Sequence, residues 1–199
     1  MKTRLAVDLS GLPPFGFDNR SPIWWGTLGF VAIEGMGFVL AVGLTLYLKH
    51  VNPHWPMDAA PPDLLPGTLL TGVLLASLWF NRSADKAARD GDLSGTRLWL
   101  VVMTVVGLAT IGLRLWEFNA LNVRWDQNAY GSCQWLLLGL HATHLITDVG
   151  DTAVLTALMF TKHGRGKRYS DVSDNAFYWS FVVAAWIPIY GLVYWVPRW

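Results

Sequence analysis

Five long apolar stretches constrain this chain more than any other feature of its sequence. They cover residues 23–48, 65–80, 97–118, 130–160 and 175–195. A helix needs about 20 mostly apolar residues to cross the hydrocarbon core of a bilayer. Backbone polar groups must be satisfied inside that core, which favours helices over isolated strands. The sequence therefore predicts an all-α bundle of five transmembrane helices.

The composition excludes several other classes of protein. Charged residues make up 15% of the 199 residues, against about 25% in soluble domains. The formal net charge of +1 provides no attraction for a nucleic acid. A single cysteine, Cys133, cannot form an intramolecular disulfide. Twelve tryptophans suit a chain with two membrane interfaces. Together these counts indicate a polytopic membrane protein.

The basic residues are unevenly divided between the two sides of the predicted membrane domain. Most of the 15 Lys and Arg residues fall on the side of the N-terminus: Lys2, Arg4, Arg20, Arg82, Lys86, Arg89, Arg97, Lys162, Arg165, Lys167 and Arg168. The other side holds Lys49, Arg124 and Arg198, and Arg114 lies within the third stretch. Because basic loops stay in the cytoplasm, residues 1–22 are predicted to form a cytoplasmic tail. Residues 23–199 are predicted to form one membrane domain whose C-terminus lies outside.

Ionisable residues inside apolar stretches are expensive and are therefore candidates for function. Glu34 lies near the middle of the first stretch, with no basic residue within a helical turn. It needs a partner on another helix, access to water, or a proton. Two interpretations stay open: a structural hydrogen-bonding acid, or an acid with a role in lipid binding or proton transfer.

The third stretch ends in LRLWEF, which places Arg114 and Glu117 three residues apart. Residues three apart share a helix face and can pair. We interpret them as an ion pair near the outer interface that fixes helix packing.

The fourth stretch contains GLHATHLITDVGD, with His141, His144, Asp148 and Asp151. At 100° per residue these four side chains fall within an arc of about 80°. Such a polar stripe faces other helices or a wet cleft rather than lipid. It suits a hydrogen-bonded seam between helices, a proton path or, with Glu34 or Glu117, a metal site. Ligation of haem by both histidines is disfavoured because they share one helix.

Several motifs occur in a characteristic order. They are GFVAIEGMGFVLAVG around Glu34, WP followed by LLPGTLLTGVLLASLW, LRLWEF with Glu117, YGS followed by GLHATH with His141 and His144, and YWSFVVAAW followed by YW, with Tyr178, Trp179, Trp186, Tyr194 and Trp195. This order resembles that of cytochrome c oxidase subunit III, a family of haem-copper oxidase subunits. Five spans with a cytoplasmic N-terminus resemble its short bacterial form, which lacks the first two of seven helices.

The resemblance implies a non-catalytic subunit of a respiratory terminal oxidase in the bacterial cytoplasmic membrane. It would dock on subunit I, with subunit II and further subunits nearby. Haem and copper would belong to the partner subunits, and this chain would bind no redox centre. It would bind phospholipid in a cleft between its helices and support proton uptake and sustained turnover. Glu34 would be the acid at this cleft, and the stripe from His141 to Asp151 would form the polar seam between helices.

Three residues depart from the family pattern. Ser180 stands where the family has His, Val183 where it has Asp, and Asp148 where it has Gly. These departures keep open an alternative function as an accessory protein of a nitric oxide reductase. A hypothesis from another class is a stand-alone membrane metalloenzyme that uses the fourth stretch together with Glu34.

Overall fold

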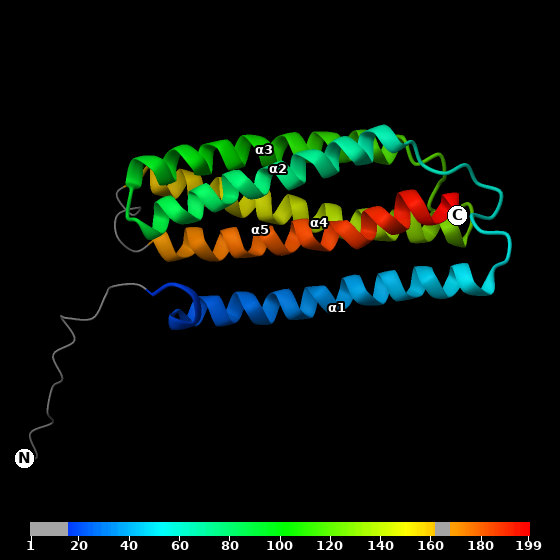
Figure 1. The fold of residues 1–199 in the computed structure, drawn as a ribbon, viewed down its shortest axis with the longest axis horizontal. Helices are drawn as coiled ribbons and strands as arrows, with labels where there is room; N and C mark the ends of the chain where they lie inside the picture. Colours follow the sequence, from blue (N-terminus) through cyan, green and yellow to red (C-terminus); the bar gives the residue numbers. More distant parts are fainter. Residues whose placement is uncertain (1–15, 162–167) are drawn as a thin grey trace, which may run out of the picture.

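The computed structural model describes residues 16–161 and 168–199, and within them the fold is entirely helical (Figure 1). The five long helices are α1 (Pro22–Val51), α2 (Leu64–Arg89), α3 (Leu93–Asn119), α4 (Ala129–Met159) and α5 (Tyr169–Tyr190). A short turn η1 (Asp18–Arg20) precedes α1, and α5 continues into a π-helical turn η3 (Gly191–Trp195) and a 3₁₀ turn η4 (Val196–Arg198). The predicted all-α fold is confirmed.

Four of these helices are long and apolar enough to cross a membrane: α1, α2, α3 and the stretch Tyr169–Arg198 that includes α5. Helix α4 is 31 residues long but is not among them. Its polar stripe, from His141 to Asp151, lowers its mean hydropathy. Helix α4 therefore carries most of the polar side chains found within the apolar stretches, and these side chains must pack against other helices rather than lipid.

The helices extend beyond the apolar stretches, and the connection expected after the second stretch is much shorter than predicted. Arg82, Lys86 and Arg89 lie within the last turns of α2, and Arg97 lies in α3. Residues 81–89 directly after the apolar run contain good helix formers and neither Gly nor Pro, so α2 continues to Arg89. Gly91, with φ +70°, makes the tight turn that remains. Among the other basic residues of this side, Lys2, Arg4, Lys162, Arg165 and Lys167 lie outside the described residues.

Local sequence signals mark where several helices begin. Pro22 occupies the first turn of α1, where its missing N–H is not needed. The Asp92 carboxylate accepts a hydrogen bond from the Ser94 N–H at 3.0 Å and caps α3. The Asn128 side chain accepts one from the Gly131 N–H at 2.7 Å and caps α4.

Helices α2 to α5 pack as a tight group, and α1 lies along one flank of it (Figure 1). We call the end where α1 begins the N-side and the end where the chain finishes the C-side. Helix α4 buries 15 residues, whereas α1 buries only Phe38, Ala41 and Thr45. All three belong to the C-side half of α1, and its N-side half contains no fully buried residue.

Helices α2 and α5 are joined by side-chain hydrogen bonds along most of their length. The Trp179 indole donates to Ser77 Oγ at 2.8 Å, the Trp186 indole donates to Thr71 Oγ1 at 2.8 Å, and the hydroxyls of Thr68 and Tyr190 lie 2.8 Å apart. Hydrogen bonds and small residues hold helices together where lipid removes the hydrophobic drive for association.

Of the departures from the family pattern, Ser180 lies in this same α2–α5 contact and Val183 lies in the core. The amide of Asn81 donates to the Ala176 carbonyl at 2.7 Å and to Ser180 Oγ at 3.2 Å. Val183 is buried in the apolar core. Ser180 therefore serves a polar contact between helices, and Val183 serves packing.

Candidate functional site

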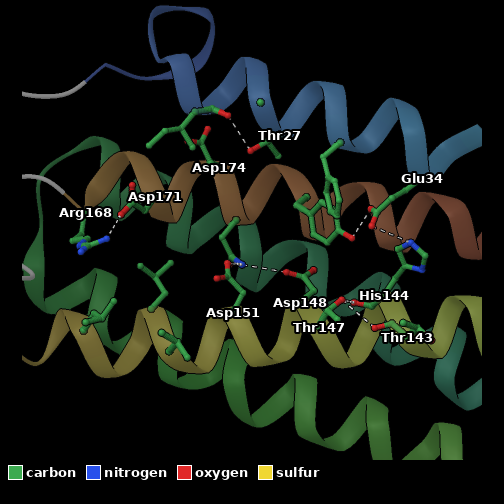
Figure 2. Close-up of a pocket in the computed structure, with 18 residues that line it drawn as sticks. Thr27, Glu34, Thr143, His144, Thr147, Asp148, Asp151, Arg168, Asp171 and Asp174 are labelled. Carbon is green, nitrogen blue, oxygen red and sulfur yellow. Dashed lines mark hydrogen bonds and ion pairs between the residues drawn. The ribbon is translucent and has the colours of Figure 1, made fainter.

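A cleft of about 850 Å³ separates the N-side half of α1 from α4 and α5 (Figure 2). Helix α1 contributes Ile23, Gly26, Thr27, Phe30 and Glu34, and side chains of α4 and α5 form the opposite walls. The cleft exists because this half of α1 buries no side chain against the bundle. Its volume lies in the range of pockets that hold small organic ligands.

Glu34 closes the inner end of the cleft through two contacts. Tyr178 Oη donates to Glu34 Oε2 at 2.6 Å, and His144 Nε2 lies 3.3 Å from Glu34 Oε1 (Figure 2). Phe30 stacks on the Tyr178 ring and Phe38 packs against His144. An acid from α1 is thus tied to one residue each from α5 and α4.

The contact between His144 and Glu34 joins two side chains that can each bind a proton. His144 Nδ1 lies 2.6 Å from the Leu140 carbonyl, which only accepts, so Nδ1 is the nitrogen placed to donate there. The other nitrogen, Nε2, faces Glu34 Oε1 and is free to interact with its carboxyl group.

A second polar group lies closer to the N-side, on the wall formed by α4 and α5. The amide of Asn175 donates to Asp148 Oδ1 at 3.1 Å and to Asp151 Oδ2 at 3.2 Å. Its own oxygen accepts from Thr152 Oγ1 at 3.2 Å. Asp148 is only 2% exposed, and its Oδ2 has no hydrogen-bond partner among the described residues.

The N-side mouth of the cleft carries both signs of charge. Arg168 Nη1 donates to Asp171 Oδ2 at 2.9 Å. Asp174 also lines the cleft, and its buried Oδ2 lacks a partner within the described part of the chain. Carboxyl groups therefore outnumber cations along the described walls.

His141 belongs to a different network, on the C-side of the bundle. Arg114 Nη2 donates to His141 Nδ1 at 2.7 Å, and His141 Nε2 donates to the Val182 carbonyl at 3.0 Å. Arg114 also pairs with Glu117 and stacks over the Trp186 ring, 4.2 Å from its centroid. Tyr194 Oη donates to Glu117 Oε1 at 2.5 Å. Arg114, Glu117 and His141 are all almost fully buried.

The stripe on α4 therefore divides between His141 and His144. His141 joins Arg114 and Glu117, whereas His144, Asp148 and Asp151 line the cleft with Glu34. The structure places the residues of the predicted ion pair within hydrogen-bonding distance of each other, but in the protein interior.

Sequence reasoning named Tyr178 but missed three acidic or amide residues that α5 adds to the site, Asp171, Asp174 and Asn175. Asn175 marked the start of the fifth stretch, while Asp171 and Asp174 fell outside it. Helix α5 begins at Tyr169, one and a half turns earlier, so all three lie on the helix that faces α4. The available signal was the spacing of these residues, because positions three or four apart share a helix face.

Across residues 16–161 and 168–199, no three His, Cys, Asp or Glu side chains are arranged to hold a metal ion. The histidines within the bundle offer little to a metal. Both ring nitrogens of His141 are engaged, and Nδ1 of His144 is committed to Leu140.

Fold and site define an all-helical integral membrane protein with ionisable side chains enclosed between its helices. The profile of the family "Cytochrome c oxidase subunit III" matches residues 27–198, and the chain belongs to this family. It is 24% identical over 176 residues to "Cytochrome c oxidase subunit 3" of Thermostichus vulcanus, with 87% of each chain covered. It is 27% identical over 175 residues to the protein of the same name from Synechocystis sp., covering 85% of this chain and 74% of the relative. A "Probable cytochrome c oxidase subunit 3" of Nocardia farcinica is 26% identical over 180 residues, with 86% of each chain covered.

Proposed function

We propose that this chain is a non-catalytic subunit of a haem-copper terminal oxidase in a bacterial cytoplasmic membrane. It docks on the catalytic subunit I, in a complex that contains subunit II and further subunits. The observation that carries the proposal is the family match, which extends over nearly the whole chain. The names of the relatives point to the same kind of complex.

In this proposal all five long helices cross the membrane, including α4, and the N-terminus is cytoplasmic. Helix α4 is long enough at 31 residues, and its polar side chains face α3, α5 and the cleft rather than lipid. The excess of basic residues at the N-side supports the orientation. Residues 1–22 then form a tail on the cytoplasmic side and residues 23–199 the membrane domain.

The cleft between α1 and the bundle binds phospholipid and supports proton uptake by the neighbouring catalytic subunit. The apolar side chains that line it, among them Ile23, Phe30 and Val154, suit acyl chains. Glu34 and His144, with Tyr178 as a third partner, provide protonatable side chains at the inner end. Glu34, Asp148 and Asp151 act at this cleft, while His141, Arg114 and Glu117 lock the C-side.

Haem and copper belong to the partner subunits in this proposal. The engaged nitrogens of His141 and the buried pairing of Arg114 with Glu117 leave these side chains no role as metal ligands. What the chain supplies is a surface for its partners and a protonatable, lipid-binding cleft.

Purification in mild detergent on a tag fused to this chain tests the proposal. Visible redox spectra and mass spectrometry of the co-purifying proteins are the readouts. We expect an oxidase subunit I with its haems. A nitric oxide reductase subunit would instead establish the accessory function. A colourless chain that purifies alone would overturn both, and stoichiometric metal lost in His144→Ala would then favour an independent metalloenzyme.

A further inference from the structure

Two carboxyl groups on the α4 wall of the cleft have no cationic partner among the described residues. Asp148 and Asp151 are held side by side by the Asn175 amide, and neither forms an ion pair. Asp148 Oδ2 is buried and unpartnered, although its residue lines the cleft. A buried polar atom without a partner costs free energy comparable to a lost hydrogen bond. The site is therefore built to receive a donor from the cleft.

The charged side chains around the cleft indicate the charge of the group that carries this donor. Glu34, Asp171 and Asp174 line the same cleft as the aspartate pair, and Arg168 is the one described Lys or Arg residue there. An anionic headgroup would meet repulsion along most of this wall. A positively charged group would gain from it, and most from the pair that already lacks a partner.

The number of N–H donors distinguishes between the kinds of ammonium group that could bind the aspartate pair. A primary ammonium group carries three N–H donors, and carboxylates are acceptors that form strong charge-assisted hydrogen bonds with it. A quaternary ammonium group carries the same charge but no N–H donor. The unpartnered oxygen of Asp148 therefore favours the primary over the quaternary amine.

The depth of the pair suits a lipid headgroup. A 31-residue helix is about 46 Å long, and it exceeds a hydrocarbon core of about 30 Å by about 8 Å at each end if it is centred. Asp151 lies eight residues, or about 12 Å, from the end of α4 at Met159. It therefore lies within a few ångströms of the hydrocarbon boundary, and Arg168 lies closer to the N-side mouth.

We propose that the cleft selects a phospholipid with a primary ammonium headgroup, whose ammonium binds between Asp148 and Asp151. Its phosphate lies toward Arg168, and an acyl chain follows the apolar side of the cleft past Phe30. The inference rests on the proposed lipid-binding function of the cleft and adds the headgroup that it takes. The Asn175 amide positions the two carboxylates for this ligand.

Lipid retention by the tagged complex tests the inference. The complex is stripped by detergent exchange, incubated with equimolar phosphatidylethanolamine, phosphatidylcholine and phosphatidylglycerol, washed, and analysed for retained lipid by mass spectrometry. We expect phosphatidylethanolamine to be retained preferentially. The isosteric double variant Asp148→Asn/Asp151→Asn is expected to lose about tenfold in this preference, as for one charge-assisted hydrogen bond.

Asp90→Asn is the matched control, because Asp90 is an exposed N-side aspartate outside the cleft. It should leave the preference unchanged. Equal retention of the three lipids by the wild type, or the same preference in the double variant, would overturn the inference. Preferred retention of phosphatidylglycerol would overturn it as well. Co-purification of the catalytic subunit is scored in the same samples, so the proposed function is judged separately from the headgroup.

Discussion

The ionisable side chains at the two ends of the bundle have different surroundings. On the C-side, Arg114 joins Glu117 and His141 in a network within the protein interior, where Arg114 Nε is the one atom of the three side chains without a partner among the described residues. On the N-side, Glu34 and Asp148 face an open cleft, and Asp148 Oδ2 has no hydrogen-bond partner in the described part of the chain. Both ends use residues of the same polar stripe of α4, namely His141 on the C-side and Asp148 on the N-side. The difference shows that polar residues of α4 stabilise the packing where helices surround them. Where α1 lies further from the bundle, the polar residues line a cleft that can bind a ligand.

The largest expected contrast comes from the same substitution at the two acids. Glu117→Gln removes one charge of a buried pair and should lower the free energy of unfolding by about 3–5 kcal/mol. Glu34→Gln changes a residue at the inner end of an open cleft and should cost about 1 kcal/mol or less, because the Gln carbonyl can still accept from Tyr178. Unfolding titrations in SDS measure both. Equal costs would remove the distinction between the two ends.

Helix spacing should differ between the two ends as well. A Cβ at Gly67 would collide with the Tyr194 ring, so Gly67→Ala should destabilise the protein by about 1–3 kcal/mol through overpacking. Gly29 in the N-side half of α1 has open space where its Cβ would lie, and Gly29→Ala should be neutral or slightly stabilising. Thermal aggregation followed by size-exclusion chromatography compares the two variants. A stable Gly67→Ala protein would show that the C-side packing adjusts easily.

The two tyrosines that donate to glutamates provide a finer comparison. Tyr194→Phe leaves a fully buried Glu117 with one donor fewer and should cost about 2 kcal/mol. Tyr178→Phe removes a half-buried donor to Glu34, which the cleft leaves partly accessible, and should cost about 1 kcal/mol or less. The same SDS titration is the measurement. A larger loss for Tyr178→Phe would mean that Glu34 stabilises the fold more than the cleft geometry indicates.

The smallest effect is expected at the N-side surface. Arg89 holds Asp18 through two hydrogen bonds of 2.8 Å, which lowers the pKa of Asp18 below its ordinary value. Its contribution is therefore present above about pH 4 and is lost as the pH falls further. Because the Asp18 side chain is 56% exposed, Asp18→Asn should cost less than about 1 kcal/mol at pH 7. Melting temperatures of both proteins at pH 7 and pH 3 test this, and a difference that does not shrink at pH 3 would contradict it.

The sequence predicted which side chains are polar within the bundle, but it did not predict their partners. His141 and His144 are three residues apart and share a face of α4, so spacing alone placed them in one seam. Their separation into two networks depends on where α3 and α1 lie, and no local pattern encodes that. Asp171 and Asp174 were missed for a related reason, since α5 begins before its apolar stretch does.

The sequence by itself determined the apolar stretches and the polar stripe of α4. A membrane-spanning chain must satisfy its backbone locally, so helices follow from length and hydropathy. Only the tertiary structure decided that α1 packs through its C-side half and leaves a cleft at its N-side half. That outcome depends on contacts between residues far apart in the chain, such as Tyr178 with Glu34 and Tyr194 with Glu117. The sequence by itself determined the helices, and the packing of side chains between them decided which buried charges are closed off and which remain open to a ligand.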